Sequence, residues 1–222
     1  MRQEVSYTCS LDNSADIPHI APTKETFMTF QTPNWDLALL GRINQSWQNP
    51  LLDSLMPMLS SEIFLWIATL TLIAAGLRYK IVGVTVILSL GISIAASDLA
   101  CTIIKEGVGR VRPYHSVAGT RYLDSETWTV RPQHSTTTKH RGSSFPSAHA
   151  ANSAAAALVL FATLRKKAIW LIPLFIGYSR VYVGKHYPVD VLAGWAIGLI
   201  VAGMLLPLYP KLWERFRSRW IR

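Results

Sequence analysis

The sequence predicts an all-α integral membrane protein, a bundle of five to six transmembrane helices. Three observations support this fold class: half of the 222 residues are hydrophobic, only 16% are charged, and the mean hydropathy is +0.24. A soluble domain of this size seldom needs so much apolar residue, whereas a membrane domain does. The composition also excludes a disordered protein, which would be poor in apolar residues, and two cysteines are too few for a disulfide scaffold.

The N-terminal part of the chain divides into a tail and an amphipathic segment. Residues 1–34 are polar and lack the uninterrupted apolar stretch of a secretory signal peptide. In residues 35–59, apolar side chains such as Leu37 and Leu40 recur at helical spacing, and Asn34 is a candidate N-cap. This pattern predicts one or two amphipathic helices at the membrane interface. If the segment spans the membrane instead, the bundle has six helices.

Five long apolar runs follow, and each is a candidate transmembrane helix. A spanning helix needs about 20 residues, so the first and fourth runs are long enough only with flanking residues at the interface. Buried helices of a soluble protein are the alternative, but too little polar chain remains to cover five of them. Small residues within the runs favour close helix packing in lipid. The runs comprise residues 63–77, 81–104, 147–164, 168–183 and 189–206.

The distribution of charge predicts how these helices are oriented. The chain carries 22 Lys and Arg against 13 Asp and Glu. With five spans, ten of the basic residues and one acid fall on one side, in the turns at 78–80 and 165–167 and in the tail 211–222. The positive-inside rule places this side in the cytoplasm, so the loop 105–146 faces outward. The net charge therefore reports topology, and we expect no nucleic-acid partner, because no binding motif is present.

Three polar segments at the ends of the apolar runs contain residues that lipid does not tolerate without a reason. In the five-span topology, which rests on hydropathy and charge alone, all three emerge on the outward side. They therefore predict one site at the outer membrane–water interface. The segments are Lys105-x6-Arg112-Pro113, Phe145-Pro146-Ser147-Ala148-His149 and Ser179-Arg180-x5-His186-x3-Asp190.

The cations of these segments indicate a phosphate ligand. Lys105, Arg112 and Arg180 can meet at one point, where the planar guanidinium groups suit bidentate contact with phosphate oxygens and the lysine adds a point charge. Ser147 stands where a helix begins, just after Pro146, and a helix N-terminus offers free N–H groups and a positive dipole to an anion.

The two histidines can transfer the phosphoryl group. Asp190, four residues after His186, can hold one imidazole nitrogen as N–H and leave the other as a nucleophile for phosphorus. His149 can protonate the departing oxygen and then act as a base on water. The cations would stabilise charge on the transition state. No Asp/Glu cluster of the metal-binding type lies near the motifs, so we predict catalysis without a metal or a cofactor.

The three motifs, in this order, resemble the signature of the type 2 phosphatidic acid phosphatase family. The resemblance covers about residues 35–206 and departs at Ala148, where the family usually has glycine; alanine keeps the backbone N–H that this position offers to phosphate. It implies a helical membrane enzyme that removes phosphate from lipid phosphates or diphosphates without a metal. The implied roles are His186 as nucleophile, His149 as acid, Asp190 as orienting carboxylate, and Lys105, Arg112, Ser147 and Arg180 as phosphate ligands.

Other polar residues near the motifs have less specific interpretations. Asp98 either tunes the site or makes a structural hydrogen bond or ion pair with a neighbouring helix. Glu106 and Arg110 are interpreted as solvated charges at the rim. The loop 105–146 is longer than a connection needs, so it forms either a lid over the head group or a flexible insertion.

Within that loop, two further groups of residues are considered as ligands, one for a metal ion and one for a second phosphate. His134 and His140 match no common metal-ligand spacing, so we expect them to be solvated. The candidates for binding a second phosphate are Arg121, Arg131, Lys139 and Arg141.

The leading hypothesis is a membrane phosphatase domain at 35–210 that hydrolyses a lipid phosphate or diphosphate, on the outer face of a bacterial cytoplasmic membrane. Undecaprenyl diphosphate is the favoured substrate; phosphatidic acid, phosphatidylglycerol phosphate and a lipid A phosphate remain open. A phosphohistidine can also pass its phosphoryl group to another lipid, which would make the protein a phosphotransferase. Vanadate-dependent haloperoxidases have a similar anion site but are soluble. A transporter or scaffold without turnover is the non-enzymatic alternative, and the oligomeric state is not determined by the sequence.

Overall fold

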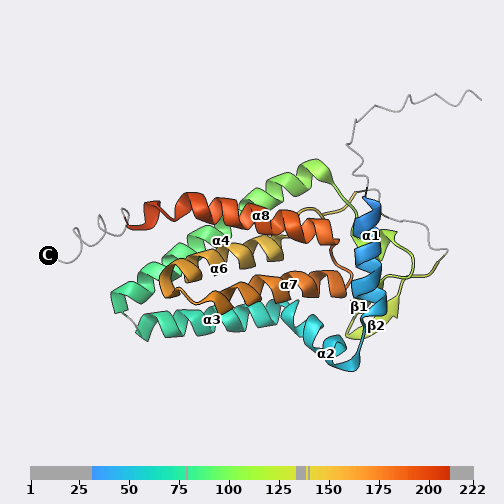
Figure 1. The fold of residues 1–222 in the computed structure, drawn as a ribbon, viewed down its shortest axis with the longest axis horizontal. Helices are drawn as coiled ribbons and strands as arrows, with labels where there is room; N and C mark the ends of the chain where they lie inside the picture. The colour runs from blue at the N-terminus through green and yellow to red at the C-terminus, as the bar shows by residue number, and fades with distance from the viewer. Residues whose placement is uncertain (1–31, 79, 134–138, 140, 211–222) are drawn as a thin grey trace, which may run out of the picture.

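The computed structural model describes residues 32–210, apart from residues 79, 134–138 and 140. The expectations for most of the N-terminal tail, for the basic tail 211–222 and for His134 and His140 lie outside these residues. Five helices run side by side along the long axis of the molecule and coincide with the five apolar runs (Figure 1). They are α3 (Glu62–Arg78), α4 (Lys80–Val108), α6 (Ala148–Leu164), α7 (Leu171–Tyr182) and α8 (Pro188–Leu205), with a short 3₁₀ helix, Lys167–Trp170, before α7.

Not every helix of this bundle has the length of a membrane span. By length and composition, the described segments Gly83–Ser116 and Pro188–Leu205 can each cross a membrane. A third crossing results if α3 and the helix before it, which meet at 60°, together form one bent span. The mostly helical architecture and its apolar helices agree with the predicted fold class, and the number of five to six spans stays a prediction.

The amphipathic segment before the bundle forms two helices. Asn49 caps the second of them, because its Oδ1 accepts a hydrogen bond of 3.0 Å from the Leu52 N–H. Asn34 is the first helical residue and Pro33 occupies the cap position, so the prediction that Asn34 is the N-cap is wrong. In Figure 1, the first helix crosses one end of the bundle and the second leads into α3. The elements are α1 (Asn34–Gly41), a π-helical turn (Arg42–Ser46) and α2 (Pro50–Leu59).

The long loop contains the only sheet of the described residues, which the all-α prediction does not include. A short helix, α5 (Pro113–Ser116), precedes an antiparallel hairpin of β1 (Arg121–Asp124) and β2 (Thr127–Val130). The buried Asn44 fastens the hairpin to the bundle. Its Nδ2 donates to the carbonyl oxygens of Arg121, at 2.8 Å, and of Tyr182, at 2.7 Å. Strands of four residues leave too few alternations to be predicted from the sequence.

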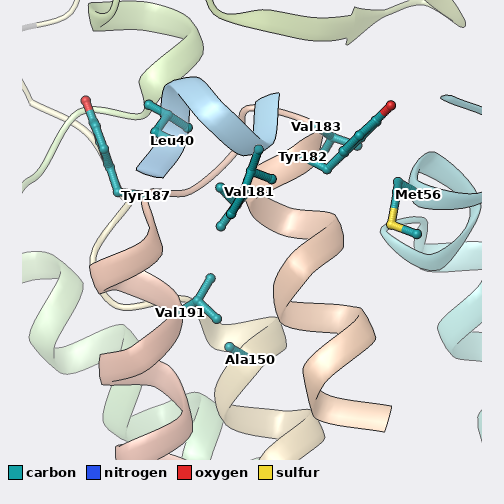
Figure 2. Close-up of a cluster of buried hydrophobic side chains, with 9 residues drawn as sticks. Leu40, Met56, Ala150, Val181, Tyr182, Val183, Tyr187 and Val191 are labelled. Carbon is teal, nitrogen blue, oxygen red and sulfur yellow. The ribbon is translucent and has the colours of Figure 1, made fainter. Parts of the chain in front are cut away.

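Close packing and an apolar cluster hold the motif-bearing end together. A Cβ on Gly194 would stand 2.4 Å from the Ser147 carbonyl oxygen, and one on Gly198 would stand 2.1 Å from that of Ala151. These glycines let α8 approach α6 closely, as the predicted small-residue packing requires. Figure 2 shows the apolar cluster at this end, to which α1, α2, α6, α7 and α8 all contribute side chains. The ends of these helices are therefore fixed relative to one another.

Candidate active site

The three motifs meet at one end of the bundle, beside α1 and away from the turn at 165–167 (Figure 1). The Ser147 N–H donates to the Asp190 carbonyl oxygen at 2.9 Å, which joins the second motif to the third. The N–H of Ser144, the residue directly before the second motif, donates to the Arg110 carbonyl oxygen, also at 2.9 Å, which joins this end of the loop to the first motif. The convergence predicted from hydropathy and charge is therefore present in the structure.

His186 is buried in the turn between α7 and α8, with 2% of its surface exposed. Its Nδ1 lies 2.8 Å from the carbonyl oxygen of Ser144. Because a carbonyl oxygen only accepts hydrogen bonds, we assign the proton of the neutral ring to Nδ1. This tautomer leaves Nε2 with a free lone pair, which is the form that a nucleophile requires.

Asp190 lies beside His186 and is also linked to it through Ser144. Its Oδ2 is 3.6 Å from His186 Nδ1, which is longer than a hydrogen bond. The same oxygen accepts hydrogen bonds from Ser144 Oγ at 2.6 Å and from the Tyr187 N–H at 2.9 Å. The sequence-based expectation of a direct bond from imidazole to Asp190 therefore needs correction: the Ser144 carbonyl orients the ring, and Asp190 fixes Ser144. The sequence gives no signal for this backbone contact.

The surroundings keep His186 uncharged near neutral pH. Burial lowers the pKa of His186 to about 4; the nearby Asp190 opposes this shift, and the charges of Arg180 and Arg112 add to it. Both arginines are among the cations predicted to bind phosphate. At pH 7 the ring is neutral and can form a bond to phosphorus.

Arg110 is not a solvated rim charge, and that interpretation is wrong. The residue is 5% exposed and lies between two buried carboxylates. Its guanidinium donates to Asp36 Oδ2 at 2.8 Å and to Asp190 Oδ1 at 2.5 Å. Its Cζ lies 3.6 Å from the centroid of the Tyr187 ring. Asp36 comes from α1, so this ion cluster connects α1 to the start of α8, where Asp36 also accepts a hydrogen bond from the Val189 N–H.

Glu106 and Asp98, the other two polar residues near the motifs, each agree with an interpretation made from the sequence. Glu106 is exposed. Asp98 accepts a hydrogen bond of 3.2 Å from Asn152 Nδ2, which links α4 to α6. Of the two interpretations of Asp98, this contact supports the structural hydrogen bond with a neighbouring helix.

The predicted phosphate ligands Lys105, Arg112 and Arg180 form a cluster of cations. Their side chains interact electrostatically with one another. Within the described part of the chain, none of the three has a carboxylate oxygen within 4.0 Å. Arg180 is 4% exposed, and its Nη1 is held by the backbone carbonyl and the hydroxyl of Ser60, at the junction of α2 and α3. Arg180 is buried and Lys105 and Arg112 are half-buried, and such cations without carboxylate partners suit an anionic ligand.

Lys185 adds a fourth cation that the motif analysis missed. It is half-buried in the turn before His186, where the motif counts it as a spacer. Burial and then the charges of Arg180 and Arg112 lower the pKa of Lys185, so it belongs to the same cluster. Its position directly before His186 is the signal that could have identified it from the sequence.

The start of α6 supplies polar groups to this cluster. Ser147 is the N-cap of α6 and Ala148 its first residue, so their neighbourhood carries the N–H groups that a helix cannot satisfy internally. Ser147 Oγ, His149 Nε2 and Arg180 Nε are buried and have no hydrogen-bond partner within the described ranges. His149 interacts electrostatically with Arg180, His186 and Lys185. Phosphate oxygens would supply the partners that such buried groups need.

The four loop residues considered for a second phosphate fall into two pairs. Arg121 is used by the hairpin, since it lies 3.1 Å from Asp53 and over the Trp128 ring. Arg131 donates to the Tyr114 carbonyl oxygen at 3.3 Å. Lys139 and Arg141 instead line a cavity together with Arg112. Among the described residues, no group of three or more His, Cys, Asp or Glu is arranged to hold a metal ion.

Comparison with known protein families shows to which family the chain belongs. The model of the PAP2 superfamily matches residues 86–214, which is more than half of the chain. The chain belongs to the PAP2 superfamily. This result confirms the family that the three motifs resemble.

Named relatives of this PAP2 protein are lipid phosphatases. An undecaprenyl-diphosphatase of Sulfolobus acidocaldarius is 29% identical over 76% of this chain and 75% of its own. A lipid A 4'-phosphatase of Porphyromonas gingivalis is 29% identical over 78% of this chain and 71% of its own. The crystal structure of LpxE from Aquifex aeolicus has the same fold, with a TM-score of 0.63 and 24% identity over 81% of this chain and 99% of that one. Together with its long apolar helices, this makes the PAP2 protein an integral membrane protein.

Proposed function

We propose that this PAP2 protein is a metal-independent phosphatase that hydrolyses a membrane lipid phosphate or diphosphate through a phosphohistidine at His186. One observation carries the proposal: a neutral, buried imidazole, fixed at Nδ1 by the Ser144 carbonyl, stands beside cations that have no carboxylate partners within the described residues. A nucleophile and an anion site are thus combined without an intervening negative charge.

The first step transfers the phosphoryl group to the protein. A bond forms between His186 Nε2 and phosphorus while the bond from phosphorus to the leaving oxygen breaks. Lys105, Arg112, Arg180 and the start of α6 stabilise the charge on the equatorial oxygens. His149 gives its proton to the leaving oxygen; the bound phosphate offsets the neighbouring positive charges and so allows His149 to carry that proton.

The second step restores the protein. His149 takes a proton from water, the water oxygen bonds to phosphorus, and the phosphorus–nitrogen bond breaks. Inorganic phosphate leaves, and His186 is neutral again. If another lipid hydroxyl replaces the water, the same intermediate gives phosphotransfer, so the identity of the product separates these two reactions.

Undecaprenyl diphosphate is the substrate that we favour. The relative from Sulfolobus acidocaldarius that covers three quarters of both chains carries that activity in its name, although a lipid A phosphatase matches with equal identity. The charge distribution of the sequence supports a site on the outer face of the membrane, because the basic turns and tail belong to the other side.

The test uses the two histidines as matched variants. Wild-type protein, His186→Ala and His149→Ala are purified in detergent with EDTA present and incubated with a panel of lipid phosphates. Wild type is expected to release inorganic phosphate, and His186→Ala to release none. With p-nitrophenyl phosphate, whose leaving group needs no acid, His149→Ala is expected to accumulate a phosphorylated protein that His186→Ala cannot form. Phosphate release by folded His186→Ala at the wild-type rate would refute the mechanism.

A further inference from the structure

A basic cavity of about 630 Å³ opens beside the cation cluster. Three of its lining residues carry a fixed positive charge, and no carboxylate is among them. It lies between the first motif and the part of the long loop that leads to the second motif. The lining residues are Arg112, Tyr114, His115, Lys139, Arg141, Gly142 and Ser143.

Arg112 connects this cavity to the candidate active site. Its Nη2 lies 3.5 Å from Ser143 Oγ on the cavity wall. Its charge also contributes to the low pKa of His186, so the same guanidinium acts on the nucleophile. An arginine offers five N–H donors in a planar fork, which can contact two phosphoryl groups at once. An anion in the cavity and a phosphate at His186 would therefore share Arg112.

The position of Arg141 is fixed by the first motif. Its guanidinium donates to the Glu106 carbonyl oxygen, and its side chain passes over Gly109. Gly109 has a φ of +62°, and a Cβ there would stand 3.0 Å from Arg141 Cγ. The Gly142 N–H donates to the Gly109 carbonyl oxygen at 2.9 Å. These contacts hold Arg141 against the end of α4, and Arg141 lines the cavity together with Arg112.

We propose that this cavity binds a second phosphoryl group of the substrate head group. The inference rests on the proposed function and deepens it, because it selects substrates with two phosphoryl groups. In a diphosphate the two groups share an oxygen, so a ligand with its terminal phosphorus at His186 brings its second group to Arg112. The phosphorus–oxygen bond that breaks then releases a lipid monophosphate, and Lys139 and Arg141 stabilise the charge that this leaving group gains.

The experiment compares substrates with one and two phosphoryl groups in the loop variants. Lys139→Gln/Arg141→Gln is assayed with a polyprenyl diphosphate and the matching polyprenyl monophosphate, and with lipid A that carries two phosphates or one. Arg165→Gln/Lys166→Gln, at the opposite end of the bundle, removes the same charge as a control. The loop variant is expected to lose about 10- to 100-fold in kcat/KM for two-phosphate substrates, as charged hydrogen bonds imply, and to keep its rate on one-phosphate substrates.

Inorganic diphosphate and inorganic phosphate serve as probes that need no lipid. Diphosphate is expected to inhibit wild type more strongly than phosphate does, and the loop variant is expected to lose this preference. If the loop variant loses activity selectively with polyprenyl diphosphate, the second phosphoryl group belongs to the same diphosphate. If the loss is confined to lipid A with two phosphates, the second phosphoryl group is on a separate sugar position. Either outcome supports the proposal that the cavity binds a second phosphoryl group. Equal losses for one- and two-phosphate substrates, or none, would overturn it. If folded wild type hydrolyses no lipid phosphate, the proposed function itself fails.

Discussion

Two groups of charged residues near His186 differ in how their charges are balanced. In the first group, Arg110 is enclosed by Asp36 and Asp190 in a buried ion cluster. In the second group, Lys105, Arg112 and Arg180, with Lys185, have no carboxylate within 4.0 Å in the described part of the chain. Arg110 and Arg112 are two residues apart in one motif, yet they belong to different groups.

The difference separates structural charges from charges that serve a ligand. A buried ion pair that is complete needs no further counter-charge from a ligand, and removing one partner leaves an unpaired buried charge. A cluster of like charges near a nucleophile is costly by itself and becomes favourable only with an anion. The first group thus holds the fold around His186, and we propose that the second binds the phosphate.

Replacing Arg110 should have the largest effect on stability. Arg110→Leu leaves Asp36 and Asp190 buried without their cation, and we expect the free energy of unfolding to fall by about 3–5 kcal/mol. Thermal unfolding in detergent measures the change. In Arg110→Leu/Asp36→Asn, which removes one of the two carboxylate charges, part of the loss should be recovered. A variant as stable as wild type would show that the ion cluster does not hold this end of the bundle.

Replacing Arg112 should separate activity from stability. We expect Arg112→Gln to lower kcat/KM by about 100- to 1000-fold, as the loss of a donor to a transition-state oxyanion does. Its melting temperature should equal or exceed that of wild type, because one of several mutually repelling charges is gone. A lower melting temperature with unchanged activity would reverse the assignment of the two arginines.

Lys185 should have a smaller effect in the same direction. It is half-buried and adds a single point charge, so we expect Lys185→Gln to lower kcat/KM by about 5- to 20-fold, which corresponds to about 1–2 kcal/mol. Lys185→Arg retains the charge and should recover most of the rate. If Lys185→Arg is as slow as Lys185→Gln, then the effect is one of packing and not of charge.

The smallest expected effect is on the pKa of His186, which measures the charge that the cations of the second group place near the ring. In protein with labelled histidines, the His186 resonance, assigned by its loss in His186→Ala, should titrate with a midpoint at about pH 4. Since the unfolded chain binds this proton near pH 6.5, the folded state should lose stability as the pH falls from about 6.5 towards 4. In Arg112→Gln, the pKa should rise, because one charge that lowers it is absent. A wild-type midpoint near 6.5 would contradict the burial of this ring.

Much of the site could be predicted because its signals are local. Apolar runs and their lengths indicated the helices, and the charges of the turns indicated which ends lie together. Because each of the three motifs stands at the end of an apolar run, these two patterns also predict that the motifs meet at one end of the bundle. The hairpin at 121–130 was not predictable in this way, because strands this short lack a periodic pattern.

The sequence alone determined that this protein is a helical membrane protein whose His149, His186 and basic residues share one end of the bundle, because hydropathy and helix length act residue by residue along the chain. Only the tertiary structure decided the partner of each charge. Arg110 meets Asp36 from 74 positions earlier in the chain, and His186 is oriented by a backbone carbonyl of Ser144. Such pairings depend on which groups become buried together, and burial exists only once the helices have packed.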